Sequence, residues 1–150
     1  MTPLLEFDVL GTPAPQGSKR GGVTKAGKTF VYEQNTKTQT SWRQDVLNAA
    51  VVARKLEGFD TFEGPVFVDV DFRMPRPASV NIRKRPYPCV KPDADKLLRN
   101  TCDALTQAGV YRDDAQVVVC RVTKMYATDD PGGSPGARIC VGLVPLPEII

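Results

Sequence analysis

Four aspartates between residues 91 and 124 are the side chains of this sequence best suited to chemistry. Asp93 and Asp95 stand one residue apart at the start of a helical pattern, and Asp113 and Asp114 follow where that pattern gives way to a strand. Carboxylates at the ends of rigid elements are the ligands that a hard divalent cation prefers. The spacing therefore predicts a metal site.

Two basic segments flank these acids. Residues 17–37 hold five lysines and arginines against a single acid, Glu33, and residues 73–91 hold six against none. Acids for a metal beside bases for a phosphate backbone indicate metal-dependent chemistry on nucleic acid, although either segment alone could be an ordinary solvated loop. The residues expected to contact DNA phosphates are Lys19, Arg20, Lys25, Lys28, Arg83, Lys84, Arg85 and Lys91.

Histidine is absent from the 150 residues, which excludes several mechanisms. A Ser-His-Asp or Cys-His nucleophile, an imidazole-dependent nuclease and a Cys-His zinc finger all require it. Any general base must be a carboxylate, a lysine or a metal-bound water.

The four cysteines form no CxxC pair, which argues against a zinc site. Cys102 and Cys120 lie in apolar patterns and are expected in the core. This usage favours a reducing, cytoplasmic setting. The first eleven residues lack the basic start and long apolar run of a signal peptide, and no apolar run approaches membrane-spanning length.

Hydrophobic periodicity predicts a single α+β domain over residues 1–150, with two main helices packed on a mixed sheet. Basic loops are expected at 17–36 and 74–92, a mobile Gly- and Pro-rich loop over Gly11–Gly27, and a tail at 145–150. The expected order is β(β)αβαββ. The strands are Leu4–Leu10, a short Lys28–Tyr32, Pro65–Arg73, Ala115–Met125 and Arg138–Val144, and the helices are Thr40–Glu57 and Asp93 or Asp95 to Ala108.

Apolar spacing also predicts which faces are buried. In Pro65–Arg73 the apolar residues alternate with Asp69 and Asp71, which we assign to the wet face of a half-buried strand rather than to a metal pair. Glycines 58 and 109 are the expected helix stops. The stripe of the first helix is Trp42, Val46, Ala49, Ala53 and Leu56.

The two members of the Asp-x-Asp pair would point about 160° apart if both lay inside the helix. If Asp93 is instead the N-cap and Asp95 lies in the first turn, both can face one ion. Asp114 can barely reach an ion held by Asp93 and Asp95 in the same chain. The helix runs roughly 20 Å away from these residues, and the five residues before Asp114, fully extended, span at most about 17 Å. A two-fold dimer could supply Asp114 from the partner, and a site within one chain remains the alternative.

The run PDADKLLRNTCDALTQAGVYRDDAQVV resembles the signature of the RusA family of Holliday junction resolvases. The resemblance covers about a fifth of the chain. It implies a homodimeric endonuclease, phage or prophage encoded, that uses Mg²⁺ (Mn²⁺ may substitute) to cut two opposed strands of a four-way DNA junction symmetrically in recombination or repair.

The resemblance also assigns residues. Asp93, Asp95 and Asp114 fall on the family's metal-binding acids, and Arg99 falls where the family has an essential lysine. Arginine keeps the charge but does not transfer a proton at ordinary pH. Lys96 could partly take that role. Asp103 and Asp113 are expected to support the site, with Asp103 paired to Arg99 along the helix.

Two other functions stay open. A junction-binding protein with weakened chemistry would explain the arginine at position 99. A metal-dependent phosphohydrolase acting on small nucleotides is the third hypothesis, although such a substrate does not need long basic loops.

Overall fold

The computed structural model describes residues 3–17, 19–33 and 36–148. Its elements are, in chain order, β1 (Leu4–Leu10), β2 (Lys19–Val23), β3 (Thr29–Glu33), α1 (Thr36–Glu57), β4 (Val66–Met74), α2 (Ala94–Gln107), the short 3-10 helix η1 (Asp114–Gln116), β5 (Val117–Tyr126) and β6 (Gly136–Leu143).

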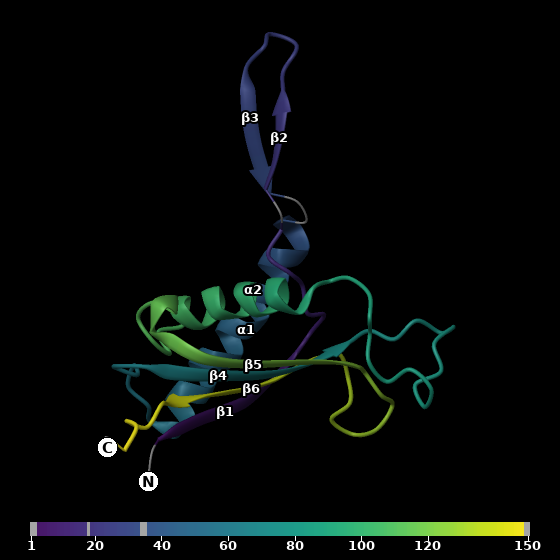
Figure 1. The fold of residues 1–150 in the computed structure, drawn as a ribbon. Coiled ribbons are helices and arrows are strands. Elements are labelled where there is room, and N and C mark those ends of the chain that lie inside the picture. The colour runs from purple at the N-terminus through teal and green to yellow at the C-terminus, as the bar shows by residue number, and fades with distance from the viewer. Residues whose placement is uncertain (1–2, 18, 34–35, 149–150) are drawn as a thin grey trace.

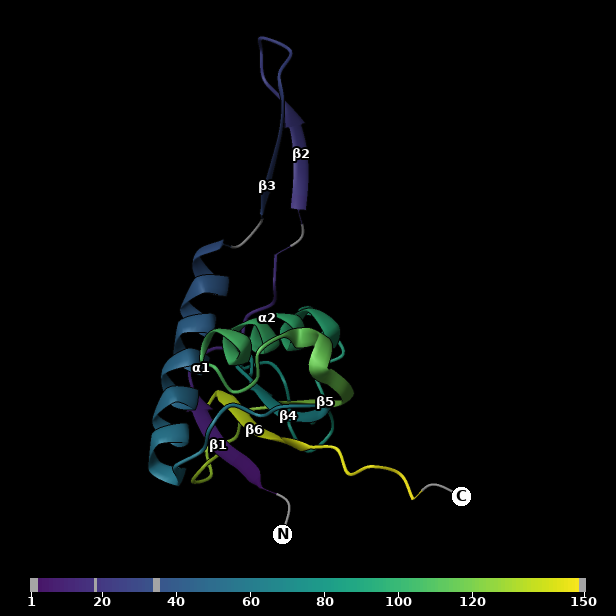
Figure 2. The ribbon, with the colours of Figure 1, turned by 90° about the vertical axis from the view of Figure 1, so that its left-hand side faces the viewer.

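Four strands form a mixed sheet in the order β1-β6-β4-β5, and both helices pack on one of its faces (Figures 1 and 2). β4 and β5 run parallel, while β6 runs antiparallel to β1 and to β4. The parallel pair needs a crossover, and α2 provides it. The predicted α+β fold with a mixed sheet and two helices is confirmed.

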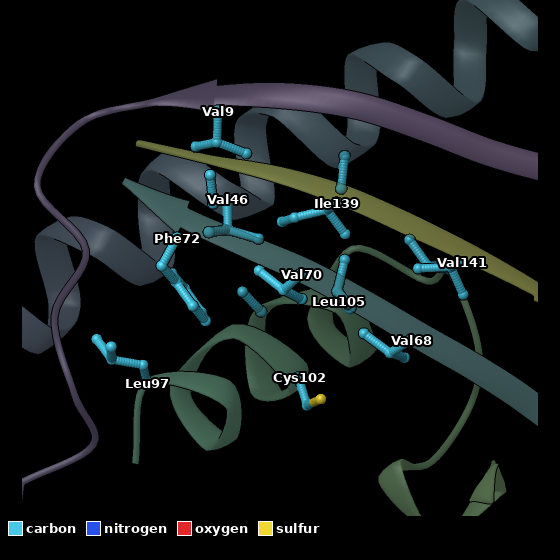
Figure 3. Close-up of a cluster of buried hydrophobic side chains, with 14 of the residues drawn as sticks. Val9, Val46, Val68, Val70, Phe72, Leu97, Cys102, Leu105, Ile139 and Val141 are labelled. Carbon is cyan, nitrogen blue, oxygen red and sulfur yellow. The ribbon is translucent and has the colours of Figure 1, made fainter. Parts of the chain in front are cut away.

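The core lies between the sheet and the helices (Figure 3). In β4 the residues Val66, Val68, Val70 and Phe72 are at most 1% exposed. From Val68 to Arg73 apolar and polar residues alternate, as a strand buried on one face requires. Trp42 of α1 is fully buried against Phe72, with ring centroids 6.3 Å apart. This packing fixes both helices on the sheet.

The N-terminal loop prediction was wrong in part. Residues 19–33 form a two-stranded hairpin, β2–β3, which projects from the body (Figures 1 and 2). The predicted strand Lys28–Tyr32 is confirmed as β3, but β2 was missed because its sequence KRGGV lacks an apolar alternation. Within the part of the hairpin whose side chains are described, Val23 and Lys25 are exposed.

Two burial predictions were also wrong. Leu56 is 81% exposed, and the buried stripe of α1 passes through Ala50 rather than Ala49. Cys120 is exposed because β5 is an edge strand, whereas Cys102 is buried as expected. Helix stops at Gly58 and Gly109 are confirmed, since each follows its helix with a positive φ.

Candidate active site

The Asp-x-Asp pair sits at the N-terminus of α2 as the sequence predicts. Asp93 is the N-cap residue with extended backbone angles (φ −69°, ψ 142°), and Asp95 lies in the first turn. The Asp93 side chain makes no capping hydrogen bond, and its Oδ2 lies 3.8 Å from Nζ of Lys96. Both aspartates are exposed. Their carboxylate oxygens are therefore open to a ligand from solvent.

Lys124 anchors the segment that leads into this helix. Its Nζ donates to the carbonyl oxygens of Val90 at 2.9 Å and of Pro92 at 2.8 Å. A strand residue of the rigid sheet thereby fixes the chain immediately before Asp93. The sequence reading missed this role, because nothing in the pattern connects a lysine of β5 to carbonyls 32 and 34 residues earlier.

Asn100 joins α2 to two other segments. Its side chain is fully buried, and Nδ2 donates to the carbonyl oxygens of Ala14 at 3.0 Å and of Gln39 at 3.1 Å. Its Oδ1 accepts from Nε of Arg43 at 3.0 Å. A buried amide with its hydrogen bonds made specifies position more sharply than an apolar contact does. The entry to the hairpin and the start of α1 are thus held against α2.

A second acidic cluster lies at the other end of α2. The hydroxyl of Thr106 donates to Oδ1 of Asp114. Asp103 pairs with Arg43 (3.3 Å). The pKa of Asp103 is raised from its usual 3.8 to about 6, first because its carboxyl is partly buried and second because the Asp114 carboxylate is adjacent. Asp103 and Asp114 are therefore neighbours, although they lie 11 residues apart in the sequence.

The predicted pairing of Asp103 with Arg99 was wrong. Arg43 of α1 is the ion-pair partner, and the charge of Arg99 lowers the Asp103 pKa less than that of Arg43 does. Arg43 was not identified because it lies 60 residues away in sequence. Only the packing of α1 on α2 brings the two side chains together.

Asp113 has a structural role, as expected. It caps η1 by accepting from the backbone N–H of Ala115 at 2.8 Å, while Gln116 Oε1 accepts from the N–H of Asp113 at 3.1 Å. This reciprocal capping box fixes the turn. The neighbouring Asp114 is left facing α2.

The two acidic ends do not meet within one chain. Asp95 and Asp103 are eight residues apart on α2, which is about 12 Å along the axis. Over the part of the chain that the structure describes, no group of three or more acidic, cysteine or histidine side chains could hold a metal ion. A three-aspartate site thus needs a further chain or a large movement.

The predicted phosphate contacts occupy two projecting segments. Lys25 and Lys28 are exposed at the tip of the β2–β3 hairpin, whereas the side chains of Lys19 and Arg20 lie outside the described residues. The exposed Arg83, Lys84, Arg85 and Lys91 belong to the loop between β4 and α2. Figure 1 shows the hairpin and this loop on two sides of the N-terminal end of α2. Any nucleic-acid strand bound at Asp93 and Asp95 would pass between the hairpin and this loop.

Comparisons with known proteins identify the family of the chain. A family model described as Endodeoxyribonuclease RusA matches residues 13–134, which include both ends of α2 and η1. The chain is 32% identical over 134 residues to the uncharacterized protein YqaN of Bacillus subtilis (strain 168), a match that covers 83% of this chain and 89% of YqaN. Among the helices of the described residues, none has the length and apolarity needed to cross a membrane.

Proposed function

The chain belongs to the RusA family of endodeoxyribonucleases, and from this premise we propose that it is a Mg²⁺-dependent enzyme that resolves Holliday junctions by paired symmetric nicks. The observation that carries the proposal is the exposed Asp93–Asp95 pair at the start of α2, flanked by two basic projections.

The donor chemistry at α2 fits a hard divalent cation. Asp93 and Asp95 offer carboxylate oxygens, and within the described residues Asp95 makes no hydrogen bond or ion pair. Oxygen-only ligation by carboxylates is typical of Mg²⁺ and Mn²⁺. When bound, the cation would polarise the phosphate and activate a water. We propose Asp93, Asp95 and Asp114 as its protein ligands.

The protein's own groups complete the site. The first backbone N–H groups of α2 favour a phosphate at the helix N-terminus. Lys96, beside Asp93, is placed to stabilise charge that develops on the phosphate. Arg99 is exposed one turn further on and contributes a phosphate contact rather than proton transfer.

A homodimer built on β5 would bring the third aspartate to the site. β5 is an edge strand, and no strand of the described chain pairs with its outer side. Val118 and Val119 on it are 59% and 51% exposed. An unpaired edge with exposed apolar residues is a surface suited to strand pairing with a second chain.

The register of such a pair can be inferred from the sequence. Val119 stands five residues after Asp114 and five before Lys124. Two β5 strands paired antiparallel and centred on Val119 bring the partner's Asp114 opposite Lys124, whose Nζ holds the carbonyl of Pro92 next to Asp93. The geometry of β5 thus favours a site shared between subunits.

Cleavage mapping on a fixed four-way junction tests the function. With Mg²⁺ we expect paired nicks at symmetric positions on the junction, and none on a linear duplex or a flap. Asp95→Asn should lower the cleavage rate by about 100-fold or more without abolishing junction binding, because a metal ligand contributes several kcal/mol. Asp71→Asn, on the opposite face of the sheet, is the matched control.

Equal cutting of all three substrates would reduce the proposal to a general nuclease. Binding without cutting in the wild type would favour the weakened junction-binding protein. Inhibition by small nucleotides but not by junction DNA would favour the phosphohydrolase.

Mixing two inactive variants tests the shared site. Asp95→Asn and Asp114→Asn chains together form a heterodimer in which one site has both variants and the other has neither. We expect the mixture to cut one strand of the junction, because one of its two sites is intact. If each site lies within one chain, both sites of the heterodimer stay defective and the mixture remains inactive.

A further inference from the structure

A recess of about 790 Å³ opens beside Asp93. One wall is the segment Thr12–Gly17, which leads from β1 toward the hairpin, and Ser41 of α1 lies next to it. The other wall comes from the loop before α2 and from the end of β5. Backbone bonds from Gln16 N–H to the Lys96 carbonyl (3.0 Å) and from Tyr126 N–H to the Pro86 carbonyl (3.0 Å) tie these walls to the sheet and to α2. The recess is therefore part of the fold and not a gap between loose loops.

The lining of this recess combines apolar surface with a buried acceptor on Gln16. Ala14, Met74 and Tyr126 are buried residues that contribute to it. Gln16 also lines it, and the Oε1 atom of this side chain is buried without a hydrogen-bond partner. A buried polar atom without a partner is rare in proteins, because burial removes its bonds to water. Here it points to a ligand that donates a hydrogen bond.

Four charged residues of the described chain also line the recess: Lys91, Asp93, Lys96 and Lys124. Lys91 is exposed, and Lys96 lies 3.8 Å from Asp93. Lys124 also lines it, but its Nζ already donates to two carbonyl oxygens. The interior therefore suits a neutral, flat, largely apolar group with N–H donors at its edge, and the rim suits an attached phosphate. A nucleobase on a DNA strand has this combination.

We propose that the recess takes up one unstacked nucleobase of the strand being cut, next to the phosphate held at Asp93 and Asp95, and that Gln16 accepts a hydrogen bond from its edge. The proposal rests on the nuclease function proposed above. Bases at a branch point are easier to unstack than those in a duplex, so a site that needs an extruded base selects junctions. The recess thereby gives both substrate selectivity and a base preference.

Filling the recess and removing the base test the idea together. Once the wild-type nicks are mapped, each nucleotide beside the scissile phosphate is replaced in turn by an abasic one. At one of these positions we expect the wild type to cut about tenfold more slowly, the scale of one lost base contact. Ser41→Trp should cut the normal junction about tenfold more slowly and should regain rate on that abasic junction, because the clash is relieved.

Thr40→Trp is the matched control, since Thr40 is an exposed neighbour on α1 that does not line the recess. It should behave as the wild type on both junctions. Indifference of the wild type to the abasic nucleotide at every position overturns the proposal, as does a Ser41→Trp variant that no abasic junction rescues. Neither result touches the nuclease function, which fails only if the wild type does not cut the normal junction.

Binding can be measured without cleavage. We expect 2-aminopurine at the responsive position to become more fluorescent when the Asp95→Asn protein binds the junction, because the base leaves its stack. Gln16→Leu keeps the backbone bond to Lys96 and should reduce discrimination among the four bases at that position. Unchanged fluorescence together with unchanged discrimination contradicts the base site. If millimolar free mononucleotide abolishes both the fluorescence increase and the base discrimination while cutting continues, the base site is also contradicted. The recess would then be a separate nucleotide site.

Discussion

Asp103 shows how neighbouring residues change the chemistry of one carboxyl. Its carboxyl is partly buried and lies beside Asp114, and Arg43 and Arg99 offset only part of the resulting rise in pKa. Like charges this close favour either a proton or a cation between them. Asp103 and Asp114 thus form a pair of acids that favours binding of a proton or a cation.

This pKa shift predicts a pH dependence of stability. Because the folded-state pKa of Asp103 is about 6 and its usual value is 3.8, the folded chain binds more protons than the unfolded chain between these values. The contribution of Asp103 to stability is present below about pH 4 and is lost as the pH rises through about 6. Asp103→Asn should therefore lose less stability than the wild type between pH 4.5 and 6.5. Urea midpoints in EDTA measure this, and equal losses in the two proteins would refute it.

The second prediction at this scale concerns the buried side chain of Asn100. Asn100→Leu keeps the number of side-chain heavy atoms but removes the hydrogen bonds to two carbonyl oxygens and to Nε of Arg43. We expect it to lower the free energy of unfolding by about 2–4 kcal/mol. Gln107→Leu, an exposed substitution on the same helix, should change it by less than about 0.5 kcal/mol. Urea unfolding measures both, and similar losses would show that the network is not what holds α2.

Elements with a repeating apolar pattern could be predicted from the sequence, and those without one could not. The alternation in β4 and the Pro-Asp-x-Asp start of α2 identified both elements and the N-cap role of Asp93, because these are local signals. β2 lacks such a pattern. The exposure of Cys120 depends on β5 lying at the sheet edge, and the Asp103–Arg43 pair depends on helix packing; neither is encoded in nearby residues.

The hairpin should bind DNA without contributing to the stability of the body. Lys25 is exposed at its tip, and its loss removes about one phosphate contact. We expect Lys25→Ala to lower the slope of log K against log salt for junction binding by about 1 and to leave the unfolding midpoint unchanged. Lys55→Ala, exposed at the far end of α1, should leave the slope as it is. Equal slopes for the two variants would exclude the hairpin tip from the bound surface.

At the scale of the whole molecule, the three proposed metal ligands lie in two separate places within one chain. Asp93 and Asp95 lie beside the end of β5, and Asp114 lies at its beginning. A two-fold axis places the beginning of one β5 strand beside the end of its copy. An antiparallel β5 pair would therefore bring Asp114 of one chain to Asp93 and Asp95 of the other, at two equivalent places. Two equivalent sites related by symmetry are what paired cuts in opposed strands require.

If the proposed dimer forms through the free edge of β5, this edge decides whether the protein is active. Val119→Lys places a charge in the middle of the proposed strand pair, where burial without a partner is costly. We expect a folded monomer by analytical ultracentrifugation, with junction cleavage reduced by about 100-fold or more because no site is complete. Val52→Lys is the matched control, since Val52 on α1 is 55% exposed and Val119 is 51% exposed. It should remain dimeric and active. A monomeric Val119→Lys protein that still cuts would show that one chain builds the site alone, and a dimeric one would move the interface away from β5.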